Sequence, residues 1–79
     1  GVKVVKKKKP AARVPEIIEA EIAAAEKELR EVSEAMSQPE VARDPKRLQQ
    51  LKSTYEQTDG RLRHLYTEWE QLSAEATSA

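Results

Sequence analysis

Apolar residues recur in the first half of the chain at alternating spacings of four and three residues. The positions are Ile18, Ile22, Ala25, Leu29, Val32 and Met36. An average repeat of about 3.5 residues keeps these side chains on one face of a helix and is typical of a coiled-coil seam. Pro15 suits the first helical position, because its missing N–H would be unpaired there anyway. The pattern predicts a helix over residues 15–36.

A second seam with the same alternation follows in the second half of the chain. It consists of Leu48, Leu51, Tyr55, Thr58, Leu62, Leu65, Trp69 and Leu72. Gly60 lies off this seam, where it weakens the helix by about 1 kcal/mol without disturbing the packing. Asp44 followed by Pro45 is the sequence of an N-cap and a first helical residue. A second helix is therefore predicted over residues 45–76, with a frayed tail over 77–79.

Residues 37–44 break the heptad pattern and form the predicted tip. Ser37 and Glu40 have the spacing of a capping box, which indicates one short helical turn. Val41 is the large apolar residue of the tip, and we expect it to pack on the end of the seam. Two heptad helices joined by so short a tip fold back on each other. The sequence therefore predicts an all-α fold, a two-helix antiparallel coiled-coil hairpin over residues 15–76 with a disordered basic N-terminal arm over residues 1–14.

The heptad pattern leaves two registers of this hairpin open, of which the first is favoured. The first register places Ala25 against Tyr55, a small residue against a large one. It leaves Trp69 and Leu72 beyond the start of the first helix, where they would need a cover from the arm or from a neighbouring domain. A register shifted by one heptad is the alternative.

Composition bears on chemistry more than on fold. The 79 residues include no cysteine and one histidine, which excludes disulfides and thiolate metal sites and leaves no ligand set for zinc. No stretch approaches the roughly 20 apolar residues of a membrane span. There is no GxxxxGK[ST] loop for phosphates. A hairpin also offers no cleft that would tune paired carboxylates for acid–base catalysis. We expect no catalytic residue, cofactor or metal in this chain, which reads as a piece of a larger protein.

The net charge is zero, but the charges are unevenly distributed. Residues 15–36 carry seven glutamates against Lys27 and Arg30, whereas residues 1–14 carry six cations and no acid. A basic arm of this kind can neutralise phosphates and release their counterions, although a solvated linker has the same composition. The candidate phosphate-binding residues of the arm are Lys6, Lys7, Lys8, Lys9 and Arg13.

Further candidate phosphate-binding residues lie at the predicted tip and along the second helix. They are Arg43, Lys46, Arg47, Lys52 and Arg63. Cations at a helix N-terminus interact unfavourably with the helix dipole, which is an argument for a contact with RNA or DNA, although basic residues that merely solvate the loop explain the pattern equally well. Tyr55 and Trp69 lie in the seam, so core packing explains these rings better than stacking on bases, and Tyr66 flanks the seam.

The two helices and their tip resemble the C-terminal domain of ABC-F ATPases of the Uup type over about 60 of the 79 residues. Three segments carry the resemblance: an IEAEI start, a Pro-Glu and Asp-Pro tip, and a Tyr-x-x-Trp-Glu-x-Leu ending. In this chain they are residues 18–22, residues 38–45, and Tyr66, Trp69, Glu70 and Leu72. The lysine run is similar to the basic linker that follows the second nucleotide-binding domain of that family. Arg13-Val14-Pro15 departs from the Ser-Tyr-Lys-type segment that often enters the first helix.

The resemblance implies a non-catalytic accessory domain of a cytoplasmic protein with two ATP-binding cassettes and no membrane domain. ATP and Mg would bind in the parent protein and not in this fragment. Family members act on ribosomes in translation, and this domain is associated with DNA binding. The expected partners are DNA or ribosomal RNA bound without sequence preference, the ribosome and the parent ATPase domains, with no membrane; the fragment itself is expected to be monomeric.

Two other interpretations remain open from the sequence. One is a protein-interaction or spacer hairpin that contacts the parent ATPase domains or another protein, with the overhang around Trp69 and Leu72 as its adhesive surface. The other is the terminal coiled-coil arm of an aminoacyl-tRNA synthetase, over which the Tyr-x-x-Trp-Glu ending favours the ABC-F family.

Overall fold

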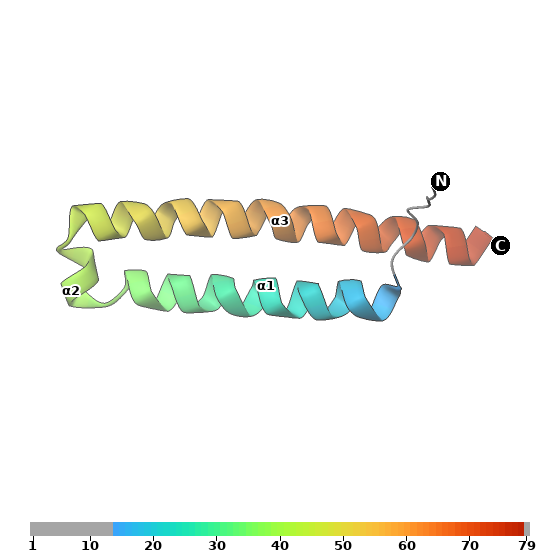
Figure 1. Ribbon diagram of the computed structural model, residues 1–79, viewed down its shortest axis with the longest axis horizontal. Helices are drawn as coiled ribbons and strands as arrows, with labels where there is room; N and C mark the ends of the chain where they lie inside the picture. The colour runs from blue at the N-terminus through green and yellow to red at the C-terminus, as the bar shows by residue number, and fades with distance from the viewer. Residues whose placement is uncertain (1–13, 79) are drawn as a thin grey trace, which may run out of the picture.

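Two long antiparallel helices and one short helix make up the computed structural model, which describes residues 14–78, with side chains described through residue 75. The helices are α1 (Pro15–Met36), α2 (Pro39–Ala42) and α3 (Pro45–Ser78). α1 and α3 lie side by side, and α2 closes the turn at one end (Figure 1). The predicted all-α antiparallel hairpin is confirmed. The predicted arm lies outside the described residues except for Val14, and residues 77 and 78, expected to fray, are helical.

Local signals fix the start of each long helix. Pro15 occupies the first turn of α1, and the extended Val14 accepts hydrogen bonds from the N–H groups of Ile17 at 2.9 Å and Ile18 at 3.3 Å. At the start of α3, Asp44 Oδ1 accepts a hydrogen bond from the Arg47 N–H at 3.2 Å. Such a side-chain cap satisfies one of the N–H groups that a helix leaves unpaired at its first turn. The predicted Asp44-Pro45 start is therefore confirmed.

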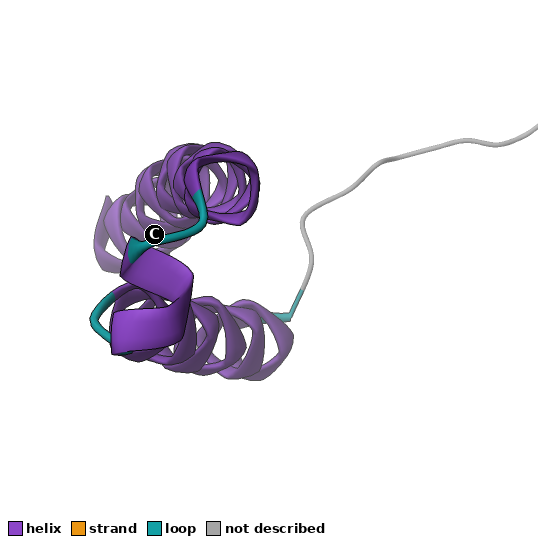
Figure 2. Cartoon of the chain, turned by 90° about the vertical axis from the view of Figure 1, so that its left-hand side faces the viewer, coloured by secondary structure: helices purple, strands orange, loops and turns teal. Residues whose placement is uncertain are grey.

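The tip forms the predicted single turn, although by another route than a capping box. Gln38 is the N-cap of α2 and makes no side-chain cap, while Ser37 Oγ donates to the Glu34 carbonyl at 2.7 Å and so closes α1. Pro39 takes the first helical position, which puts Ser37 one residue too early to cap α2. Val41 is buried, as predicted. In a view along the hairpin, α2 bridges the ends of the two long helices (Figure 2).

The core is one apolar cluster between α1 and α3. Ile18 and Ala25 from α1 and Leu62 and Leu65 from α3 are its buried members. Four partly buried residues pack against this cluster: Ile22, Leu29, Trp69 and Leu72. Thr58 is also buried, although it is polar. A Cβ atom on Gly60 would meet nothing within 4 Å, which agrees with its predicted place off the seam.

The structure has the register that is shifted by one heptad, so the register that places Ala25 against Tyr55 is wrong. Trp69 Nε1 donates a hydrogen bond to Glu19 Oε2 at 3.0 Å, and the Tyr66 hydroxyl donates to a Glu26 carboxylate oxygen. These pairs move α3 along α1 by about one heptad from the first register. Trp69 and Leu72 consequently pack on the core and need no cover from elsewhere.

Tyr55 departs from its predicted place in the core. Its side chain is 37% exposed, whereas the next seam residue, Thr58, is buried. The shifted register takes Ala25 away from Tyr55 and places the ring beside Arg30 and Ser33 at the edge of the seam.

Candidate functional site

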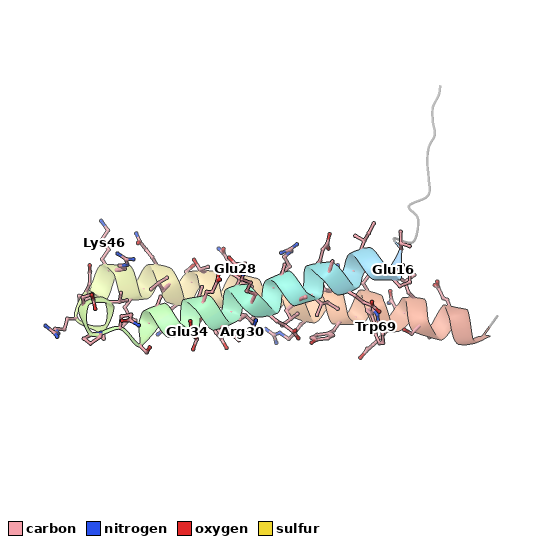
Figure 3. The ribbon with its side chains drawn as sticks, turned by 90° about the horizontal axis from the view of Figure 1, so that it is seen from below. Glu16, Glu28, Arg30, Glu34, Lys46 and Trp69 are labelled. Carbon is pink, nitrogen blue, oxygen red and sulfur yellow. The ribbon has the colours of Figure 1, made fainter. Side chains whose placement is uncertain are left out.

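Four cations gather at the α2–α3 end of the hairpin, and we refer to Arg43, Lys46, Arg47 and Lys52 as the tip cations. All four side chains are exposed. Lys46 projects at the end of the rod away from Trp69 (Figure 3). Within residues 14–78, no ion pair with a carboxylate engages any of them. Their charge is therefore available to a partner outside the chain.

Local structure presents the tip cations around the start of α3. Arg43 caps the C-terminus of α2, with its N–H bonded to the Pro39 carbonyl at 3.1 Å. Lys46 and Arg47 occupy the first turn of α3, where the nearby Asp44 carboxylate is engaged in capping the helix. Lys52 follows further along α3. The tip thus offers several positive charges over a short length of helix.

Two shallow grooves flank the first turns of α3, and each contains tip cations. One groove is lined by Asp44, Lys46, Arg47, Gln50, Leu51 and Thr54. The other is lined by Pro45, Leu48, Gln49, Lys52, Ser53 and Glu56. Lysine, arginine and glutamine side chains all donate hydrogen bonds to phosphate oxygens. The first groove has two cations and one acid, whereas the second has one of each, so the first is better suited to an anionic backbone.

The other predicted phosphate-binding residues do not join this group. Arg63 Nη2 lies 3.1 Å from Asp59 Oδ2, so an acid one turn away offsets its charge. Arg63 is also 16 residues beyond Arg47, which is about 24 Å along a helix. The arm residues Lys6, Lys7, Lys8, Lys9 and Arg13 lie outside the described residues.

α1 has the opposite electrostatic character. We refer to the paired lengths of α1 and α3 away from the tip as the shaft. Five glutamates of α1 are exposed along it: Glu16, Glu19, Glu28, Glu31 and Glu34. One of its two cations, Lys27, lies 4.0 Å from Glu31, so little positive charge opposes them. A surface of one sign repels a polymer of the same sign. A polyanion is therefore directed away from the α1 shaft and toward the tip.

Two aromatic residues of α3 are held by glutamates of α1, and the sequence analysis missed both pairs. Trp69 pairs with Glu19 and Tyr66 with Glu26. The hydrogen bond to Glu26, followed by desolvation and the charge of Glu26, raises the pKa of the Tyr66 hydroxyl. Glu19 and Glu26 each follow a seam residue and are seven residues apart. That repeat was the available signal that both carboxylates lie along one edge of the seam.

Neither a metal-ligand group nor a membrane-spanning helix occurs in the part of the chain that the structure describes. Among residues 14–78, no group of three or more His, Cys, Asp or Glu side chains could hold a metal ion. In the same range no helix is long and apolar enough to cross a membrane.

The fold and the charge distribution define a class of protein, a helical-hairpin module with an acidic shaft and a cationic tip. The family model described as the ABC transporter C-terminal domain matches residues 11–74. The chain belongs to this family, because the match covers most of its length. It is therefore an accessory, non-catalytic C-terminal domain of an ABC transporter-type protein. No curated protein and no solved structure matches the chain.

Proposed function

We propose that this chain is the nucleic-acid-binding C-terminal accessory domain of a cytoplasmic ABC-F ATPase of the Uup type. It binds the phosphate backbone of DNA or ribosomal RNA through the hairpin tip and the basic arm, without sequence preference. The observation that carries the proposal is the set of exposed tip cations without carboxylate partners among the described residues. Family membership supports the place in an ABC protein, and the tip and Tyr-x-x-Trp-Glu ending support the ABC-F subtype. The parent protein would bind ATP and Mg and hydrolyse the nucleotide.

The shape of the molecule supports this assignment. α3 has 34 residues and is about 51 Å long at 1.5 Å per residue. The start of α1 lies at the end of the rod opposite α2 (Figure 1). The tip is therefore at the far end of the rod from the first residues of α1. Phosphates neutralised there release their counterions, which supplies affinity that falls as the salt concentration rises.

The test compares two variants that lose the same charge at different places. Arg43→Gln with Lys46→Gln removes two tip cations, and Lys27→Gln with Arg61→Gln removes two exposed cations of the shaft. We expect the tip variant to bind duplex DNA and ribosomal RNA about tenfold more weakly than wild type at low salt, because two phosphate contacts are lost. The shaft variant should bind nearly as wild type does.

Two results would overturn the proposal. One is no detectable binding of either polymer by the wild-type chain at about 50 mM salt, where the phosphate contribution is strong. The other is an equal loss of affinity in the tip and shaft variants, which would mean that net charge alone is responsible.

The competing proposal is a protein-interaction or spacer hairpin that contacts the parent ATPase domains or another protein, and the adhesive surface expected for it is not exposed. It relied on an exposed overhang at Trp69 and Leu72, and both residues pack on the core. Replacing Lys6, Lys7, Lys8 and Lys9 by glutamine separates the two proposals. A nucleic-acid-binding arm loses affinity for the polymer, whereas the arm of a spacer loses none.

A further inference from the structure

One edge of the hairpin is built from aromatic residues of α3 that meet polar residues of α1. Near the open end of the hairpin, the Trp69 indole donates to Glu19. Seven residues after Glu19 on α1, Glu26 accepts a hydrogen bond from the Tyr66 hydroxyl. In both pairs, a carboxylate of α1 accepts a hydrogen bond from the aromatic side chain and so fixes the position of its ring.

The next layer toward the tip has no such carboxylate. Seven residues after Glu26, α1 carries Ser33, which is short and uncharged. The aromatic residue beside it is Tyr55, which lies 14 residues before Trp69 and therefore on the same edge of α3. Within residues 14–78, no hydrogen bond engages the Tyr55 hydroxyl. Tyr55 is 37% exposed, and its hydroxyl has no fixed polar partner in this part of the chain.

A groove of about 300 Å³ opens beside this ring. Leu29, Arg30, Ser33, Glu34 and Tyr55 line it. Leu29 is half-buried and offers an apolar surface, while the Arg30 side chain is exposed at the rim. Aromatic rings and guanidinium planes are the groups on which proteins stack unpaired bases of RNA and single-stranded DNA. The groove therefore combines two stacking groups with an apolar wall.

The charges around the groove favour a base over a phosphate. Arg30 and Glu34 both line the groove, so their charges offset each other and leave no net positive charge to hold a phosphate there. A nucleobase is neutral and needs no such charge. Lys52 lies one turn before Tyr55 on α3 and is exposed, so the backbone of the same nucleotide has a tip cation within reach.

We propose that this groove holds an unpaired nucleobase of RNA or single-stranded DNA, stacked on the Tyr55 ring with the Arg30 guanidinium beside it. The inference rests on the proposed function and adds a preference for single-stranded or looped segments over blunt duplex. The tip cations supply phosphate contacts to any nucleic acid, and the groove adds a contact that only an unpaired base can make.

The first test measures the affinity for a short single-stranded RNA of mixed sequence and for a blunt duplex DNA. Tyr55→Leu should weaken binding of the single strand by roughly 5- to 100-fold, the usual effect of losing one stacked base, and leave duplex binding unchanged. Tyr55→Phe retains the ring and should bind as wild type does. Tyr66→Leu is the matched control, because it removes another exposed tyrosine, and it should leave both affinities unchanged.

A second readout uses the wild-type protein, so it does not depend on how a variant folds. Addition of the single-stranded RNA should move the NMR signals of the Tyr55 ring protons upfield, because a stacked base shields them, while those of Tyr66 stay in place. Binding of the RNA with no shift at Tyr55 and no effect of Tyr55→Leu would overturn this inference and leave the proposed function standing. Failure of both the RNA and the duplex to bind would overturn the proposed function and this inference with it.

Discussion

Ile17 and Ile18 are adjacent residues of the same type with opposite surroundings. Ile18 is fully buried in the core cluster, whereas 48% of Ile17 is exposed. Removing one methyl group from a buried isoleucine leaves a small cavity and loses its transfer free energy. The same change at an exposed position leaves no cavity. The free energy of unfolding should therefore respond very differently to the same substitution at the two sites.

We predict that Ile18→Val lowers the free energy of unfolding by about 1 kcal/mol. Ile17→Val, the matched control, should change it by less than about 0.5 kcal/mol. Urea denaturation followed by circular dichroism measures both values. Equal effects of the two substitutions would show that Ile18 does not hold the position described.

Tyr66 provides a pH-dependent test at the same scale. Its hydroxyl donates to Glu26, which raises its pKa above the ordinary value. Because the folded-state pKa is the higher one, the stabilisation is complete below the ordinary tyrosine pKa of about 10 and is lost as pH rises through the raised value. Glu26→Gln should bring the Tyr66 pKa back toward its ordinary value, as followed by NMR of the ring. An unchanged pKa in that variant would contradict the Tyr66–Glu26 pair.

The start of α3 depends on one side chain, which makes it the clearest test at the scale of an element. Asp44 accepts the Arg47 N–H, so Asp44→Ala should destabilise the protein by about 1 kcal/mol, the usual cost of losing an N-cap. Asp59→Ala removes a partly exposed carboxylate of the same helix that pairs with Arg63, and it should cost less than about 0.5 kcal/mol. Thermal unfolding of both variants measures the difference, and a smaller cost for Asp44→Ala than for Asp59→Ala would contradict the cap.

Features of individual elements were predictable where the signal is local in sequence. The seam spacing, Pro15 and the Asp44-Pro45 step act within a few residues, and the two long helices start where those residues predict. The capping box failed because Pro39 takes the first position of α2, which a spacing rule for Ser37 and Glu40 does not include. Whether Ser37 or Gln38 becomes the N-cap of α2 depends on the backbone geometry around Pro39, which the spacing of Ser37 and Glu40 does not encode.

The register belongs to the whole molecule, and the seam pattern could not determine it. A shift of one heptad presents the same succession of seam positions to the partner helix, so both registers bury an apolar stripe. The pairing of Trp69 with Glu19 distinguishes them, because it forms in the shifted register alone. The exposure of Tyr55, and with it the proposed base-binding groove, follows from the same shift and was therefore also missed.

NMR can test the register directly. Trp69 packs against the cluster that contains Ile18, with Ile22 also part of this packing. We expect nuclear Overhauser effects between the Trp69 indole protons and the methyl groups of these isoleucines. In the other register Trp69 extends past α1, so the absence of these effects in the folded protein would contradict the structure.

The proposed binding of phosphates at the tip involves the whole molecule, because the end of α2 and the first turns of α3 together carry the tip cations. The most direct measurement is the slope of the logarithm of affinity for duplex DNA against the logarithm of salt concentration. Each phosphate contact contributes about 0.9 to this slope, so glutamine at Arg43, Lys46 and Arg47 together should reduce its magnitude by about 2 to 3. An unchanged slope in this variant, or wild-type binding that does not depend on salt, would contradict the claim.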